Sequence, residues 1–195
     1  MSNKLICICG MCGAGKSEVS DYFKGLGAFA YVRFGQVVLD EVKKISQKPS
    51  EALEREVRER FRSEMGMAAI AIKNIPKILK ELKHKNVIAD GLYSWEEYLV
   101  LKERFRDDLV VIAVYAPPSI RYARLTGRAN RHGTDESLRF RSFSTEQAEA
   151  RDKAEIENLH KAGPIAMADY LIKNDATVDE LKQNCREVYT KIFVD

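Results

Sequence analysis

The sequence predicts an α/β fold in which a parallel sheet carries helices on both faces. Short apolar runs alternate with longer amphipathic stretches along the chain, and this β-then-α alternation occurs five times. Such a pattern is typical of a parallel sheet with crossover helices. The length of 195 residues suits one α/β domain with its own core. We therefore treat residues 1–195 as a single domain.

Apolar runs mark the strands. The expected strands are Leu5–Cys9, Phe29–Val32, Asn86–Ala89, Leu109–Tyr115 and Tyr170–Lys173. The run Leu109–Tyr115 is the richest in β-branched residues, and Pro117 and Pro118 follow its end. Cys7 and Cys9 fall on one face of the first strand, where we expect them to act as small buried hydrophobes.

Amphipathic stretches between these runs mark the helices. They cover Lys16–Leu26, Gln36–Ser46, Glu51–Lys85, Trp95–Arg106, the stretch from Pro118 to about Thr126, Thr145–Lys161 and Val178–Phe193. The longest stretch is expected to break at Gly66 or Pro76, because both residues disfavour a helix interior. A polar loop up to about Ser144 separates the helix that ends near Thr126 from the helix that begins at Thr145.

Composition narrows the class of protein. The net charge is +3, from 32 basic and 29 acidic residues, which does not indicate a nucleic-acid partner by itself. The four cysteines are too few and too unevenly placed for a disulfide framework. No leader pattern is present, and no apolar run approaches the roughly 20 residues of a membrane span. We expect a cytoplasmic protein without a membrane or nucleic-acid partner; monomer and homodimer are both open.

Residues 10–17 read GMCGAGKS and follow the first strand directly. Three glycines let the backbone wrap tightly with its N–H groups toward phosphate oxygens, and the helix that follows turns its positive end to the same anion. Lys16 is placed to reach the β- and γ-phosphates, and the Ser17 hydroxyl to bind Mg²⁺. We expect a nucleoside triphosphate here. The expected nucleotide-binding residues of the loop are Gly10, Cys12, Gly13, Ala14, Gly15, Lys16 and Ser17.

An acidic residue is expected at the end of a neighbouring strand, facing the metal. Asp90, in the stretch NVIADG, ends the third strand. An aspartate before glycine is also common in ordinary turns. Beside a phosphate-binding loop we favour a role for Asp90, together with Ser17, in binding Mg²⁺.

The stretch 121–141 is rich in arginine and points to phosphoryl transfer. Gly127 and Gly133 would let it bend, and a mobile loop of this charge suits a phosphoryl group in transit and would exclude water when closed. A solvated basic face and an RNA-binding patch are the alternatives. The stretch lacks the interleaved aromatic residues that stacked bases require. Its arginines are Arg121, Arg124, Arg128, Arg131, Arg139 and Arg141.

The chain resembles the nucleotide-kinase branch of the P-loop proteins over nearly its full length. This branch contains adenylate kinase and small adenylate-kinase-related proteins described as similar to dephospho-CoA kinase. The shared motifs are GMCGAGKS, IADG, YAPPSIRYARL, RDKAE and ADYLIKND. The resemblance implies a three-layer α/β/α fold, a five-stranded parallel sheet of order 2-3-1-4-5, an acceptor-binding helical region at 33–85 and a short mobile lid at 127–144.

The resemblance also implies roles on the ATP side. Arg124 matches an arginine that packs against the donor base, and Arg128 matches one that meets its phosphates. Arg151, in RDKAE, matches an arginine that contacts the transferring phosphoryl group. Asn174 falls where the family's backbone surrounds the adenine. The expected catalytic residues are therefore Lys16, Arg128 and Arg151.

The acceptor side departs from the adenylate kinase pattern. Gly35 is present after the second strand, but Leu39 occupies the position of the acceptor arginine, and Arg33 is the arginine nearby. Arg62 matches an arginine of the small related proteins, although a solvated arginine on a charged helix is an equal alternative. Tyr93 and Trp95 either stack on an acceptor base or cap the sheet edge. The expected acceptor-binding residues are Arg33, Gly35, Arg62, Gly91 and Tyr93.

Together these features predict an ATP- and Mg²⁺-dependent kinase that transfers the γ-phosphoryl group to a small nucleotide-like acceptor, such as a nucleoside monophosphate. A dephospho-CoA kinase is one alternative, and its hydroxyl acceptor would need a carboxylate base, for which Asp90 and Asp40 are the candidates. The other alternative is a nucleotide-binding regulatory protein that hydrolyses ATP slowly.

Overall fold

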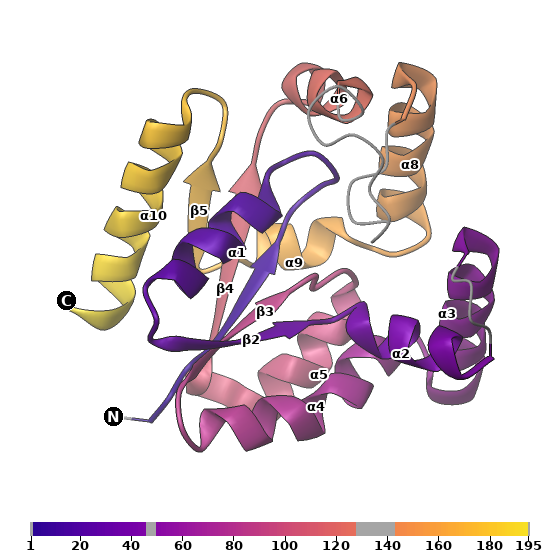
Figure 1. The fold of residues 1–195 in the computed structure, drawn as a ribbon, viewed down its shortest axis with the longest axis horizontal. Coiled ribbons are helices and arrows are strands. Elements are labelled where there is room, and N and C mark those ends of the chain that lie inside the picture. Colours follow the sequence, from indigo (N-terminus) through magenta and orange to yellow (C-terminus); the bar gives the residue numbers. More distant parts are fainter. Residues whose placement is uncertain (1, 46–49, 128–142, 195) are drawn as a thin grey trace.

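The computed structural model describes residues 2–45, 50–127 and 143–194, and it shows a five-stranded sheet between two layers of helices (Figure 1). All neighbouring strands pair in parallel, in the order β2-β3-β1-β4-β5. The predicted fold class and strand order are confirmed. The strands are β1 (Leu5–Cys9), β2 (Phe29–Arg33), β3 (Asn86–Asp90), β4 (Leu109–Tyr115) and β5 (Tyr170–Lys173).

The helices follow the predicted order, except that the helix beginning at Thr145 ends early and the short helix Ala162–Ala166 was not predicted. They are α1 (Lys16–Gly25), α2 (Gln36–Ile45), α3 (Glu51–Met65), α4 (Ala69–Leu82), α5 (Trp95–Phe105), α6 (Pro118–Thr126), α8 (Thr145–Glu157), α9 (Ala162–Ala166) and α10 (Val178–Phe193), with a 3-10 turn at Arg106–Asp108. The long helical pattern breaks at Gly66, which has a φ of 78°, and Pro76 lies inside α4. Among the described residues, no helix is long and apolar enough to cross a membrane.

Helix α8 ends earlier than the sequence predicts. We expected it to reach Lys161, but α8 ends at Glu157, and His160 adopts a left-handed φ of 49°. This turn reverses the chain, so the backbone N–H of Lys161 donates to the carbonyl oxygen of Glu155 at 3.1 Å. The short helix α9, which the sequence did not predict, begins directly afterwards.

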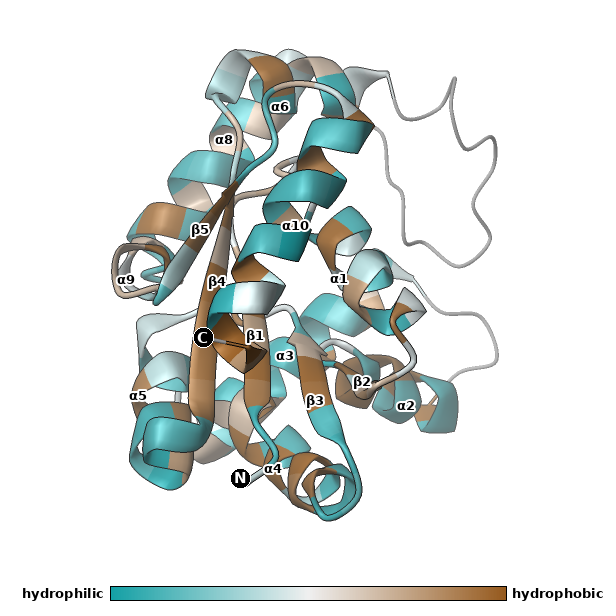
Figure 2. Cartoon of the chain, turned by 90° about the vertical axis from the view of Figure 1, so that its left-hand side faces the viewer, coloured by the Kyte–Doolittle hydropathy of each residue, from teal (hydrophilic) through white to brown (hydrophobic). Residues whose placement is uncertain are grey.

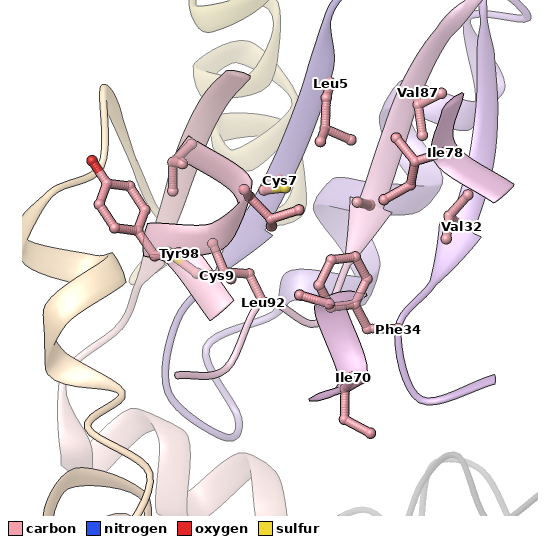
Figure 3. Packing of buried hydrophobic residues seen from close by; sticks show 14 of the residues in the cluster. Leu5, Cys7, Cys9, Val32, Phe34, Ile70, Ile78, Val87, Leu92 and Tyr98 are labelled. Carbon is pink, nitrogen blue, oxygen red and sulfur yellow. The ribbon is translucent and has the colours of Figure 1, made fainter. Parts of the chain in front are cut away.

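Two apolar cores lie on opposite faces of the sheet because alternate strand residues point to opposite sides. In the first core, Leu5, Cys7 and Cys9 of β1 pack against α2, α3, α4 and α5 (Figure 3). In the second core, Ile6 and Ile8 pack against α1 and α10. Strands β1 and β4 are hydrophobic along most of their length (Figure 2). Cys7 and Cys9 are fully buried, as predicted.

The parallel sheet brings the loops that follow its strands to one edge. Ile8 of β1 pairs with Asp90 of β3, and Arg33 of β2 pairs with the same aspartate. Gly91 donates its backbone N–H to the carbonyl oxygen of Ile8 at 3.3 Å. Residues that are far apart in sequence therefore meet beside the glycine loop at residues 10–15, which joins β1 to α1.

Candidate functional site

The glycine loop depends on backbone conformations that favour glycine. Gly10, Gly13 and Gly15 have φ values of 137°, 80° and 96°. A Cβ atom on Gly10 would lie 2.4 Å from the carbonyl oxygen of Val114 in β4, and one on Gly15 would lie 2.0 Å from Nδ2 of Asn174. The glycines thus allow the loop to approach β4 and the end of β5 closely.

Lys16 begins α1 and stays against the loop. Its Nζ donates to the carbonyl oxygens of Gly10 at 2.9 Å and Met11 at 3.1 Å. Lys16 and its neighbour Ser17 both line a cavity of about 760 Å³. The positive end of α1 points to the same space, because the helix begins at Lys16. This arrangement is suited to binding an anion.

Asn174, just after β5, is hydrogen-bonded to the glycine loop. Its Nδ2 donates to the carbonyl oxygen of Ala14 at 2.8 Å, and its backbone N–H donates to Tyr115 of β4 at 2.8 Å. Its Oδ1 accepts a bond of 3.3 Å from Nη2 of Arg124 in α6. The two residues that the family resemblance places near the donor base therefore contact each other, and both line the cavity.

Arg121 holds the loop from another side, and here the structure differs from the sequence interpretation. The arginine-rich stretch 121–141 was interpreted as a mobile loop, but Arg121 lies in α6, before the predicted lid at 127–144, and is 4% exposed. Its Nη1 donates to the carbonyl oxygen of Cys12 at 3.1 Å, and Nη1 and Nη2 bond the two carboxylate oxygens of Asp152 at 2.9 and 2.5 Å. Its Nε donates to Ala116 at 3.1 Å. Arg121 therefore joins the loop, the end of β4 and α8.

The remaining lid arginines and most of the predicted lid fall outside the described residues. This applies to Arg128, predicted to contact the phosphates, and to Arg131, Arg139 and Arg141. Arg151 is described: it lies in α8, lines the cavity, and sits 5.2 Å from the centre of the Phe143 ring.

Asp90 faces the cavity at the end of β3, next to the glycine loop. Its Oδ2 accepts a hydrogen bond of 3.1 Å from the Tyr31 hydroxyl, and the residue is partly exposed. Ser17 and Asp90 both line the cavity. Oxygen ligands of this kind suit Mg²⁺, which keeps several waters and needs only one or two protein ligands besides phosphate oxygens. The residues present therefore fit the predicted ion.

The predicted acceptor residues line the other part of the same cavity, namely Arg33, Gly35, Arg62, Gly91 and Tyr93. Arg62, from α3, has a buried Nε without a hydrogen-bond partner among the described residues. Burial lowers its pKa, and the neighbouring Glu97 raises it. A guanidinium in this state offers a donor to an anion entering the cavity. Trp95, in contrast, stacks on Tyr98 at 5.1 Å and belongs to the sheet packing.

Glu97 was not singled out from the sequence. It is 1% exposed, and its Oε2 accepts the backbone N–H groups of Tyr93 at 2.8 Å and Ser94 at 3.3 Å. Burial raises the pKa of Glu97 to about 7. The sequence carried a usable signal, since Ser94 and Glu97 have the spacing of a capping box.

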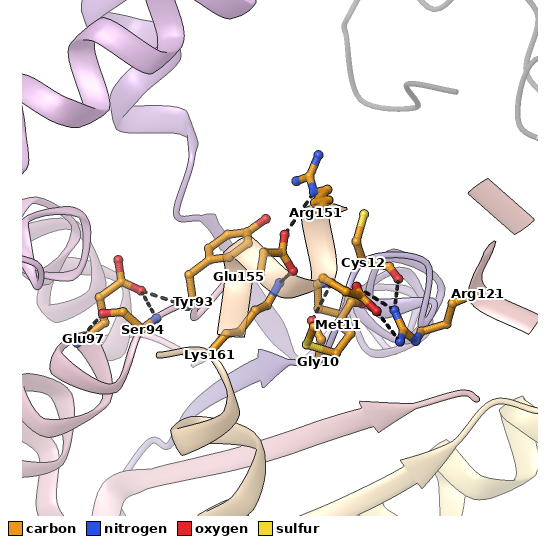
Figure 4. A network of polar contacts seen from close by, with 12 residues as sticks. Gly10, Met11, Cys12, Tyr93, Ser94, Glu97, Arg121, Arg151, Glu155 and Lys161 are labelled. Carbon is orange, nitrogen blue, oxygen red and sulfur yellow. Dashed lines mark hydrogen bonds and ion pairs between the residues drawn. The ribbon is translucent and has the colours of Figure 1, made fainter. Parts of the chain in front are cut away.

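A buried charged cluster beside the cavity was also missed. Lys161, at the start of α9, is fully buried, and its Nζ lies 2.5 Å from Oε2 of Glu155 and 4.4 Å from the centre of the Tyr93 ring (Figure 4). Oε1 of Glu155 accepts a bond of 3.0 Å from Nε of Arg151. The sequence held no local sign of this cluster, because the chain reversal at His160 forms it.

The strand order and the glycine loop define a P-loop protein with the fold of the nucleotide kinases. A family model described as an AAA domain matches residues 6–158. The UPF0200 protein of Pyrococcus abyssi (strain GE5 / Orsay) is 33% identical over 192 residues, covering 97% of each chain. That of Thermococcus onnurineus (strain NA1) is 32% identical over 193 residues, covering 98% of this chain and 99% of its own. The chain belongs to the UPF0200 family.

Solved structures agree with this fold. A Thermus thermophilus protein, TT1252, superposes with a TM-score of 0.60 at 17% identity, covering 98% of this chain and 99% of its own. Shikimate kinase from Bacteroides thetaiotaomicron superposes with a TM-score of 0.58 at 12% identity, covering 97% and 98%. At these identities the likeness concerns the fold alone.

Proposed function

We propose that this protein is a Mg·ATP-dependent phosphotransferase that moves the γ-phosphoryl group to a small nucleotide-like acceptor. The observation that carries the proposal is one cavity of about 760 Å³ that is lined by Lys16 and Ser17 on one side and by Arg33 and Arg62 on the other. A protein that only binds or hydrolyses ATP needs the first side alone. Cations on both sides suit two anionic substrates held together.

On the ATP side, the loop amides and Lys16 bind the triphosphate. Ser17 and Asp90 would hold Mg²⁺ directly or through water, and the ion would supply positive charge to offset that of the triphosphate. The family resemblance assigns Arg124 and Asn174 to the donor base, and both residues line the cavity. Gly10 and Ala14 are buried residues of this loop that pack against the rest of the protein.

Arg151 stabilises the negative charge of the phosphoryl group during transfer. The support is its position: the side chain is 37% exposed, lines the cavity and, among the described residues, is paired with one carboxylate, that of Glu155. We assign a similar role to Arg128, on the family resemblance.

On the acceptor side, Arg62 and Arg33 bind the acceptor phosphate, and Gly35, Gly91 and Tyr93 shape its surroundings. A nucleoside monophosphate fits this set because its phosphate is already an anion and needs no general base. The dephospho-CoA kinase alternative needs a base for a hydroxyl group. Asp40 does not serve, since it is exposed, bonds Gln36 at 2.7 Å and does not line the cavity. Asp90 is then the candidate base.

The experiment measures ADP release from Mg·ATP with and without a panel of nucleoside monophosphates and dephospho-CoA. We expect one nucleoside monophosphate to stimulate release strongly and to appear as the diphosphate. Stimulation by dephospho-CoA would select the alternative acceptor. Slow release that no compound stimulates would favour a regulatory ATPase, and calorimetry without any heat of Mg·ATP binding would refute both.

A further inference from the structure

Lys161 is a fully buried lysine that does not line the cavity. Taking an ammonium group out of water costs several kcal/mol unless it is paired and hydrogen-bonded. Here the pairing is with Glu155, through Nζ and Oε2 at 2.5 Å, and the face of Tyr93 adds a cation–π contact at 4.4 Å. Lys161 is thus a buried charge beside the cavity, and Glu155 and Tyr93 are the groups that stabilise it.

Glu155 lies between two cations that use different oxygens. Lys161 bonds Oε2 and Arg151 bonds Oε1, so the carboxylate stands between a buried ammonium and a guanidinium at the cavity wall (Figure 4). Burial by itself raises the pKa of Glu155, but the charges of Lys161 and Arg151 lower it by more, so that the pKa falls to about 2. Glu155 is therefore ionised at neutral pH, and a single negative charge serves both cations.

This sharing determines how firmly Arg151 is held. Arg151 gives Glu155 only its Nε, so Nη1 and Nη2 remain available toward the cavity among the described contacts. Without Lys161, the charge of the buried carboxylate would act mainly on Arg151, which is hydrogen-bonded to it, and more weakly on Lys16. An anion in the cavity would then compete with Glu155 for the guanidinium.

We propose that Lys161 is a positioning residue: by satisfying Glu155, it leaves Arg151 free to donate to a polyphosphate in the cavity. The inference rests on the proposed function, since it takes the phosphates of Mg·ATP as the ligand of Arg151. The ammonium group of Lys16 also repels that of Lys161. Burial and Lys16 lower the pKa of Lys161 to about 8, although Glu155 raises it.

The test compares Mg·ATP affinity, measured by calorimetry at pH 7, in the whole protein and three variants. Lys161→Met should weaken binding about tenfold, which corresponds to the loss of one charge-assisted contact. The double variant Lys161→Met with Glu155→Gln should bind within about threefold of the original protein, because no carboxylate then retains Arg151. Lys153→Met is the control, since Lys153 is exposed on α8, the helix that carries Arg151 and Glu155, and its ion pair among the described residues is with Glu157.

Rescue by the second substitution separates this role from a purely structural one, which would make the double variant as weak as the single variant or weaker. Either that result or unchanged binding by Lys161→Met would overturn the inference. Absence of Mg·ATP binding by the original protein would instead refute the proposed function.

A second measurement does not require the single variant to fold. Above pH 8 Lys161 loses its proton, so Mg·ATP affinity should fall between pH 8 and 10 in the original protein and stay level in the double variant. Among the described residues, the other titratable and charged groups near Lys161 are Lys16, Cys9, Cys12, Tyr93, Arg151 and Glu155. All except Glu155 are retained in the double variant, so equal pH dependence in both proteins would overturn the inference.

Discussion

Replacing Arg121 by methionine should destabilise the protein strongly. Arg121 and Asp152 are 4% and 7% exposed, and their two-bond ion pair is the main contact of both groups. Methionine fills much of the space but leaves the Asp152 carboxylate buried. Among the described residues, its remaining side-chain partner is then the Tyr122 hydroxyl at 3.0 Å. Breaking a buried pair from one side costs about 3–5 kcal/mol. A native domain has roughly 5–15 kcal/mol in total, so this is a large share.

The assay is urea unfolding at pH 7, followed by far-UV circular dichroism. We expect the midpoint to fall with little change in slope, and the thermal midpoint to fall by about 10 °C for a chain of this size. Mg·ATP binding should weaken as well, because the Cys12 carbonyl in the glycine loop loses its donor. Arg186→Met, on the exposed side of α10, is the control and should change stability by less than about 0.5 kcal/mol.

A second substitution tests the cause. In the Arg121→Met background, Asp152→Leu removes the unpaired carboxylate and should restore part of the lost stability. The reasoning is refuted if Arg121→Met costs less than about 1 kcal/mol, or if Asp152→Leu in that background lowers stability further.

Three further predictions concern the loop and the acceptor side. Lys16→Ala should abolish ADP release while circular dichroism and the thermal midpoint stay nearly unchanged; a variant that still turns over would contradict the proposed mechanism. Gly10→Ala should lower the free energy of unfolding in urea by about 3 kcal/mol, because Gly10 has a φ of 137° and its added Cβ would clash with Val114. Gly25→Ala is the matched control: its Cβ meets nothing within 4 Å, so this variant should be neutral or slightly stabilising. Burial raises the pKa of Glu97 from 4.5 to about 7, so the cost of ionising it in the folded state is absent below pH 4.5 and complete above pH 7. Glu97→Gln should therefore gain stability relative to the original protein between pH 5 and 8, by about 3 kcal/mol at most; parallel pH dependence would count against this.

Much of the site could be predicted because its chemistry is contiguous in the sequence. The eight residues GMCGAGKS carry their own turns, donors and helix start, and the strand before them and the helix after them appear where expected. Asp90 could be predicted because a parallel sheet brings the end of β3 beside the end of β1, and Ile8 indeed pairs with Asp90.

Other residues could not be interpreted from their neighbours in sequence. Arg121 belongs to an arginine-rich run, yet α6 turns it inward to Asp152, which is 31 positions away. Asp40 was named with Asp90 as a candidate base for a hydroxyl acceptor, but Asp40 is exposed on α2. Neither outcome follows from composition, because the direction of a side chain depends on what the helix packs against.

By itself, the sequence determined the α/β fold, the glycine loop and the anion that such a loop suits, because these follow from local backbone preferences and from the alternation of apolar runs. Only the tertiary structure decided how the charges are divided around the cavity. The left-handed turn at His160 returns Lys161 to Glu155, and Glu155 then lies between Lys161 and Arg151. Such pairings join groups from different elements in a medium of low dielectric constant, where a few ångströms decide which charge is neutralised and which is offered to a ligand.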